Sequence, residues 1–194
     1  MSKTISIFWF RRDLRLDDNV GLYYALQSGK DILPIFIFDS EILQELPKND
    51  ARVTFIHETL QKINSLLISN FNSGIAMYYG SPKSVFEQLT RQYVINSVYT
   101  NHDYEPYAIK RDNEINAFLN SKNISLKTFK DQVIFERDEI VKSDGSPYKV
   151  YTPYSKKWLE QFKSNNTLVY NSEDYLDNLY KLKNLPTLRH FKSE

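Results

Sequence analysis

Five short runs with the character of β-strands alternate with segments of helical periodicity along the first two thirds of this chain. The runs lie at residues 5–10, 32–38, 75–79, 98–100 and 124–129. Strands that alternate with helices imply βαβ units, in which right-handed crossovers join parallel strands. The second run is apolar on both faces, as expected for a strand covered by helices on each side. We therefore predict an α/β fold with three layers, α/β/α, around a five-stranded, mostly parallel sheet.

A dense block of charge follows the first predicted strand. It extends from Arg11 to Asp18, and Asn19 then opens an amphipathic segment, so the pattern predicts a strand, a charged turn and a capped helix. Ligands bind beyond the carboxyl ends of strands in open α/β sheets, so this turn should border a site. The same charges also suit an ion-pair network at the helix start. The turn lacks GxGxxG, which argues against a standard dinucleotide cradle in this Rossmann-like pattern.

Two carboxylates follow the fourth predicted strand. Asp103 and Glu105 fall on the same side of an extended turn because side chains alternate along it. They can accept hydrogen bonds from a planar heterocycle, or they can form a catalytic carboxylate pair. A third interpretation is that they cap the helix expected from about Pro106, where acidic residues favour the positive end of the helix dipole.

Aromatic and charged residues also gather at the second strand and at the helix after it. Phe36 and Phe38 can stack on a planar ring, although Phe36 equally suits the core, and Asp39 ends the strand. Arg52 can hold an anionic tail, and Phe55 lies one helical turn further on. These residues are candidates for the same site.

Composition limits the function classes. Lys plus Arg total 25 and Asp plus Glu total 24, so the net charge of +1 creates no global field for nucleic acid. The chain has no cysteine, and its three histidines show no metal-ligand spacing. The residues after Met1 do not form a signal peptide, and no apolar run is long enough to span a bilayer. We expect a soluble, cytoplasmic protein.

Three sequence blocks in a fixed order carry a family signature. They are Trp9-Phe10-Arg11-Arg12-Asp13-Leu14-Arg15-Leu16 with Asp18-Asn19, Asn101-His102-Asp103-Tyr104-Glu105-Pro106-Tyr107 with Arg111-Asp112, and Tyr148-Lys149-Val150-Tyr151-Thr152-Pro153-Tyr154 with Trp158. Together they closely resemble the signatures of the DNA photolyase and cryptochrome family. One block alone is weak, whereas three at family-like separations cover most of the chain.

The resemblance implies the antenna-binding domain of a deoxyribodipyrimidine photolyase, which uses light to split pyrimidine dimers in DNA. In that family an antenna chromophore passes excitation to a catalytic FAD; the antenna is a deazaflavin, FMN or FAD, or methenyltetrahydrofolate. Positions matching Arg11, Arg52, Phe55 and Glu105 border or line the pocket in relatives. With the strand-end residues Phe36, Phe38, Asp39 and Asp103 they form the predicted cofactor site, and the aromatic residues and Arg52 favour a flavin or deazaflavin.

The resemblance also divides the chain. Residues 1–132 are expected to form the antenna-binding domain, and residues 133–194 a linker towards a helical domain that holds FAD and UV-damaged DNA. Nothing in residues 1–194 resembles that helical domain, so the chain alone is predicted to be inactive, without catalytic residues, and a weak binder of nucleic acid. The alternatives are a cryptochrome photoreceptor and a stand-alone nucleotide- or flavin-binding module.

The last part of the chain shows two apolar stripes. Four-residue spacing predicts an aromatic stripe on a short helix at residues 154–162, formed by Tyr154, Trp158 and Phe162. A weaker stripe follows, formed by Leu176, Leu179 and Leu182. The tail is rich in Asn, Lys and Leu, and we expect it to build no second core.

Overall fold

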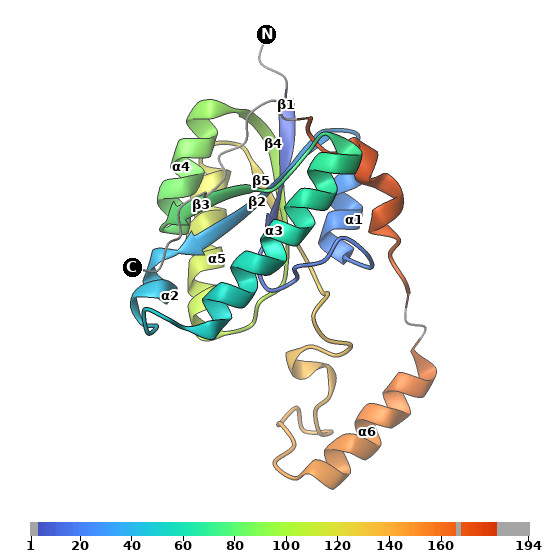
Figure 1. Ribbon diagram of the computed structural model, residues 1–194. Helices are drawn as coiled ribbons and strands as arrows, with labels where there is room; N and C mark the ends of the chain where they lie inside the picture. The colour runs from blue at the N-terminus through green and yellow to red at the C-terminus, as the bar shows by residue number, and fades with distance from the viewer. Residues whose placement is uncertain (1–3, 166–167, 182–194) are drawn as a thin grey trace.

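The structure is a computed structural model that describes residues 4–165 and 168–181. Its centre is a five-stranded sheet in the order β3-β2-β1-β4-β5, in which every neighbouring pair is parallel (Figure 1). The strands are β1 (Thr4–Phe10), β2 (Asp31–Asp39), β3 (Ala76–Gly80), β4 (Val94–Asn101) and β5 (Ser125–Phe129). The predicted α/β fold and its five-stranded parallel sheet are confirmed.

Helices cover both faces of the sheet because successive strand residues point to opposite sides. Trp9 of β1 belongs to an apolar cluster with residues of α4 and α5, whereas its neighbour Phe8 packs on the other face with α1 and α3. The helices of the α/β unit are α1 (Val20–Leu26), α2 (Ser40–Gln44), α3 (Ala51–Phe71), α4 (Pro82–Gln92) and α5 (Pro106–Asn120).

Short polar side chains begin the helices that follow β1 and β3. The Asn19 side chain accepts a hydrogen bond from the Leu22 amide at 3.1 Å, as the sequence predicts for the start of α1. Ser81 accepts from the Ser84 amide at 3.3 Å, and Pro82 occupies the first helical position of α4. Both strand-to-helix turns are therefore fixed locally.

Pro34 lies inside a central strand, where proline normally removes a ladder hydrogen bond. It aligns with Phe8 of β1, but β3 joins β2 only from Ile35 onward. The backbone N–H and C=O groups of successive residues point to opposite edges of a strand, so the Pro34 nitrogen faces the same edge as the Ile32 carbonyl. That edge is the one beside β3, at a level where β3 has not yet begun. Proline is tolerated because no β3 residue requires its amide.

The chain returns to this open side of β2 after Tyr170. We call residues 170–181 the strap; it contains the 3₁₀ helix η2 (Ser172–Asn178). Leu179 forms a parallel bridge with Ile32, and the Tyr180 amide donates to the Ile32 carbonyl at 2.7 Å. The strap thus takes the position beside β2 that β3 leaves empty.

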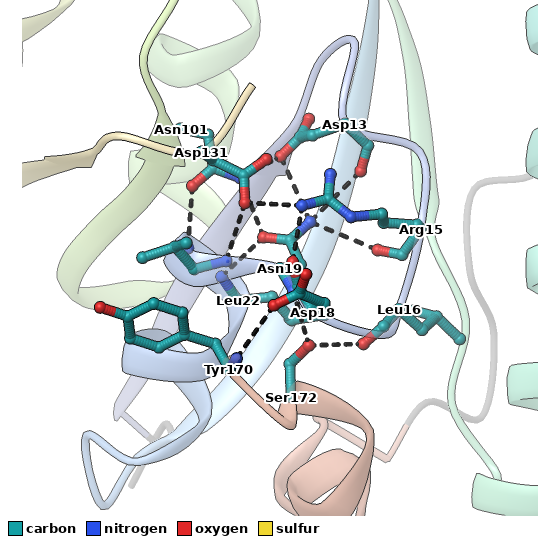
Figure 2. Close-up of polar contacts among 12 residues, drawn as sticks. Asp13, Arg15, Leu16, Asp18, Asn19, Leu22, Asn101, Asp131, Tyr170 and Ser172 are labelled. Atoms are coloured by element: carbon teal, nitrogen blue, oxygen red, sulfur yellow. Dashed lines mark hydrogen bonds and ion pairs between the residues drawn. The ribbon is translucent and has the colours of Figure 1, made fainter. Parts of the chain in front are cut away.

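The strap is part of the core of the α/β unit and not a second core. Leu176 and Leu179 are buried in the same apolar cluster as α1, and their three-residue spacing matches the three residues per turn of a 3₁₀ helix. Ser172 is also buried; its hydroxyl donates to the Leu16 carbonyl at 2.6 Å (Figure 2). Leu182, the third leucine of the predicted stripe, lies outside the described residues.

We call residues 132–165 and 168–169 the arm; in the chain it follows β5 and precedes the strap. The arm carries η1 (Arg137–Glu139) and the helix α6 (Tyr151–Ser164), which stands apart from the α/β layers in Figure 1. The predicted helix with its aromatic stripe is confirmed: Trp158 stacks on Phe162 at 5.0 Å between ring centroids, and Phe135 meets Trp158 edge-on at 5.5 Å. The domain boundary at residue 132 stays a prediction.

Candidate functional site

A cavity of ≈ 310 Å³ opens beyond the carboxyl ends of β1, β2 and β4, between α3 and α5. We call it the strand-end cavity. Seven of the eight residues selected from the sequence line it: Arg11, Phe36, Phe38, Asp39, Arg52, Asp103 and Glu105. Strands far apart in sequence end at the same edge of a parallel sheet, which is why these side chains meet.

Phe36 and Phe38 form an apolar wall of the strand-end cavity. Both are buried in the cluster beneath α1 and α3, and their ring centroids lie 4.8 Å apart at an interplanar angle of 69°. Phe36 is therefore both a core residue and part of the cavity wall, so the two interpretations of this residue are compatible. The edge-to-face arrangement fixes both rings before any ligand arrives.

Glu105 occupies the cap position of α5, but its side chain makes no capping hydrogen bond. Instead it accepts from Arg12 Nη2 at 2.6 Å, and Arg12 Nε lies 3.9 Å from Asp103 Oδ2. The Asp103 carboxylate accepts from the Glu105 amide at 3.3 Å. The capping role therefore falls partly to Asp103, whereas Glu105 forms a half-exposed ion pair at the cavity.

Arg11 is held by protein groups on all sides. Its guanidinium binds both oxygens of Asp112 at 2.7 Å and donates to the Asn101 carbonyl. Burial lowers the pKa of Arg11, and the charge of Asp112 opposes that shift. Arg11 thus anchors β1 to β4 and α5 and contributes the floor of the cavity.

Asp39 is positioned by Tyr107, a residue that the sequence reasoning missed. The Tyr107 hydroxyl donates to Asp39 Oδ2 at 2.6 Å, while Asp39 Oδ1 caps α2 by accepting from the Glu41 amide at 3.1 Å. Partial burial and the hydrogen bond to Asp39 raise the pKa of Tyr107, so its hydroxyl stays a donor at neutral pH.

Arg111 is the second residue missed, and it lies four residues after Tyr107 on α5. It is buried, with its guanidinium 5.0 Å from the Trp9 ring centroid and 5.7 Å from that of Tyr107. Arg111 Nη2 is within 3.1 Å of Asp112 yet makes no hydrogen bond with any described residue. The four-residue spacing within the second sequence block was the available signal, since it puts both side chains on one helix face.

Arg52 and Phe55 lie at the outer end of the strand-end cavity. Arg52 is paired with Asp50 at 2.7 Å and is solvent-exposed. Phe55 does not line the strand-end cavity; it is 68% exposed and borders an adjoining groove of ≈ 650 Å³. Arg11, Arg12 and Arg52 line both hollows, so the groove and the cavity adjoin at these arginines.

Two further features are absent from residues 4–165 and 168–181. These residues contain no group of three or more His, Asp or Glu side chains placed to hold a metal ion. Across the same residues, none of the helices combines the length and the apolar character that a membrane crossing requires.

An all-parallel sheet in the order β3-β2-β1-β4-β5, with helices on both faces, is a doubly wound α/β fold, and the strand-end cavity lies at the edge where such folds commonly bind ligands. Residues 6–172 match the family model described as DNA photolyase, so the chain belongs to that family. Deoxyribodipyrimidine photo-lyase from Synechococcus sp. is 35% identical over 157 residues, which are 81% of this chain and 32% of that protein.

Solved structures show the same architecture. A bacterial class III photolyase from Agrobacterium tumefaciens superposes with a TM-score of 0.72 at 22% identity, over 86% of this chain and 33% of that one. An archaeal photolyase from Sulfolobus tokodaii, solved with two FAD molecules, gives 0.61 at 30% identity, over 69% of this chain and 32% of that one. The chain spans about a third of the length of these relatives.

Proposed function

We propose that this chain is a light-harvesting domain that binds a planar antenna chromophore in the strand-end cavity. Proteins of the photolyase family bind FAD and antenna chromophores. The observation that carries the proposal is the meeting of seven residues, chosen from the sequence, around one cavity of ≈ 310 Å³. Small-molecule pockets typically measure about 300–1,000 Å³, so a fused-ring head group fits this space.

The polar groups of the cavity fit a heterocycle that carries carbonyl oxygens. Arg111 lines the cavity, and its buried Nη2, which is ion-paired with Asp112 at 3.1 Å, makes no hydrogen bond with a described residue. A ring carbonyl that reached Nη2 would supply the missing acceptor. Flavins, deazaflavins and pteridines all carry such carbonyls, and Phe36 and Phe38 offer the matching apolar wall.

The acidic residues would receive the ring N–H groups of the chromophore. Glu105 is half-exposed at the cavity and already holds Arg12, so a ligand N–H would share this carboxylate. Both oxygens of Asp39 already accept a hydrogen bond, one from the Tyr107 hydroxyl and one at the cap of α2. Its main role towards the chromophore is therefore to position Tyr107. When bound, the chromophore supplies the absorption of light and the transfer of excitation to FAD.

Direct titration tests this proposal. Riboflavin 5′-phosphate, a deazaflavin and methenyltetrahydrofolate are each added to the purified protein, and absorbance and fluorescence are followed. We expect one of them to bind in a one-to-one ratio with a perturbed absorption band, and Arg111→Met to weaken it. Failure of all three to bind, with the protein folded by circular dichroism, would contradict the proposal.

Repair of UV-damaged DNA is proposed for the complete photolyase and not for residues 1–194 alone. The relatives are about three times as long as this chain, and we assign FAD and DNA to a helical domain of the kind implied by the resemblance. The aromatic stripe of α6, which the sheet leaves uncovered, is the surface we assign to that domain. The net charge of +1 agrees with weak DNA binding by the domain itself.

A further inference from the structure

Two side chains that line the strand-end cavity carry rings that lose an electron easily: Trp9 and Tyr107. The other aromatic residues in the described lining are phenylalanines, which resist oxidation; they are Phe10, Phe36 and Phe38. A photoexcited flavin or deazaflavin is a strong one-electron oxidant, so such a ring in the cavity would have two electron donors close by. The charges around each donor decide between them.

Two guanidinium groups lie beside the indole of Trp9. The Cζ atom of Arg11 is 5.2 Å from the Trp9 ring centroid, and that of Arg111 is 5.0 Å from it. Both cations are paired with the same carboxylate, that of Asp112, at 2.7 Å and 3.1 Å. Oxidation would put a positive charge on the indole, and like charges at this distance repel strongly in a buried, low-dielectric site. Trp9 is therefore the poorer electron donor.

The hydroxyl of Tyr107 already has a proton acceptor. It donates to Asp39 Oδ2 at 2.6 Å, a length typical of a strong hydrogen bond to an ionised carboxylate. Asp39 is buried, and its other oxygen accepts from the Glu41 amide at 3.1 Å, so the carboxylate is held in place. A phenol that loses an electron becomes strongly acidic, and its proton would move along this bond. The acceptor belongs to the protein, so no ligand atom has to reach Asp39.

Transfer of the proton keeps the oxidised ring of Tyr107 neutral. Arg111 lies 5.7 Å from the centroid of this ring as well, but the change of charge falls on Asp39 and not on the ring. Partial burial and the hydrogen bond to Asp39 raise the pKa of Tyr107, so the resting hydroxyl is protonated and the electron and the proton leave together. Tyr107 is therefore the better donor of the two.

We propose that Tyr107 donates an electron to a photoexcited flavin or deazaflavin ring in the strand-end cavity, with Asp39 as the acceptor of its proton. The inference rests on the proposed function, because it needs such a ring in the cavity. One electron leaves the phenol for the excited ring, the O–H bond of Tyr107 breaks, and the proton binds Asp39 Oδ2. Return of the electron and the proton restores both side chains, so the light energy is lost as heat without a net reaction.

The pair formed by Tyr107 and Asp39 removes excitation that has not been passed on. Coupled transfer of an electron and a proton is slower than the transfer of excitation from the short-lived singlet state. Tyr107 therefore acts on the long-lived triplet state, which otherwise reacts with oxygen. The pair protects the cavity from photo-oxidation and leaves light harvesting intact.

Transient absorption of the full chain, saturated with riboflavin 5′-phosphate or the deazaflavin, tests the inference. Saturation of each variant removes any effect of a changed affinity. We expect the wild type to show the spectrum of a neutral tyrosyl radical and a triplet state that decays more slowly in heavy water. Tyr107→Phe should lengthen the triplet lifetime at least about tenfold. Tyr104→Phe is the matched control, because Tyr104 is 44% exposed and lies outside the cavity lining, and it should leave the lifetime unchanged.

Asp39→Asn distinguishes a proton acceptor from a structural partner. The amide oxygen can still accept the hydrogen bond of Tyr107 but cannot take up its proton, so the triplet lifetime should lengthen as in Tyr107→Phe. If Asp39→Asn does not fold, the two tyrosine variants and the effect of heavy water still decide.

The outcomes separate this inference from the proposed function. An unchanged lifetime in Tyr107→Phe, or a tryptophan radical in place of the tyrosyl radical, would overturn the inference while the chromophore still binds. Binding of methenyltetrahydrofolate alone would also overturn it and leave the proposed function standing. Failure of every chromophore to bind would contradict both.

Discussion

Replacing Leu179 with alanine tests whether the strap belongs to the α/β core. Leu179 is 1% exposed and packs in the cluster formed by α1, α3 and one face of the sheet. The substitution removes this contact but leaves the backbone hydrogen bond from Tyr180 to Ile32 in place. The effect therefore measures side-chain burial and not loss of the strand-like pairing.

The magnitude follows from the depth of burial. A leucine enclosed on all sides costs about 2–5 kcal/mol when truncated to alanine, and we expect about 3 kcal/mol here. For a domain of this size, that loss lowers the melting temperature by roughly 6–12 °C. Leu168→Ala is the matched control, because Leu168 is 66% exposed on the arm and should cost less than about 0.5 kcal/mol.

Urea unfolding followed by circular dichroism gives both free energies of unfolding. Native-state hydrogen exchange adds a second readout: the Tyr180 amide should be protected like the amides of β2, whereas amides of the arm exchange faster. Equal, small losses in Leu179→Ala and Leu168→Ala, together with an unprotected Tyr180 amide, would refute the account of the strap.

Three other predictions concern stability and DNA. Burial raises the pKa of Tyr78 to about 12. Its native state keeps a proton that the unfolded chain loses above about pH 10, so stability falls between about pH 10 and 12, by an amount on the order of 3 kcal/mol at most. In urea unfolding, Tyr78→Phe should reduce this loss of stability at alkaline pH. The substitution should cost little at neutral pH, because the buried hydroxyl has no hydrogen-bond partner among the described residues. An unchanged loss at alkaline pH would contradict this prediction. Asn19→Ala should cost at least about 1–2 kcal/mol in thermal unfolding, since Asn19 caps α1 and also bonds Asp13 and Asn101; a loss below about 0.5 kcal/mol would contradict this. A gel shift of residues 1–194 with UV-damaged duplex should show no specific band at moderate salt. Light-dependent repair by this chain alone would refute the assignment of FAD and DNA to a separate helical domain.

The sheet could be predicted from sequence because most strands are short apolar runs followed by a turn signal, and β5, whose residues are more polar, still follows a helix and alternates in character. The strap could not, since Leu176 and Leu179 stand in a polar segment and their spacing belongs to a 3₁₀ helix, which periodicity searches for α-helices and strands pass over. Its position beside β2 depends on where β3 begins, and that register is a tertiary property.

The candidate site likewise contains a part that could be predicted from the sequence and a part that could not. Residues at strand ends could be selected because parallel strands deliver them to one edge. Their partners could not: Glu105 pairs with Arg12 across 93 positions, and Asp39 receives the hydroxyl of Tyr107 from a different layer. Such pairings depend on side-chain directions that appear only once the helices pack on the sheet.

The most direct test of the central claim, that the strand-end cavity binds the antenna, compares two glutamates of one helix region. Glu105 lines the cavity at the start of α5, while Glu114 lies on α5 outside it and serves as the control. A charge-assisted hydrogen bond contributes about 1.5–3 kcal/mol, so Glu105→Ala should weaken chromophore binding about tenfold to a hundredfold, and Glu114→Ala should leave it unchanged. Equal affinity of wild type and Glu105→Ala, measured by absorbance titration with the chromophore that binds, would remove Glu105 from the site and contradict the account.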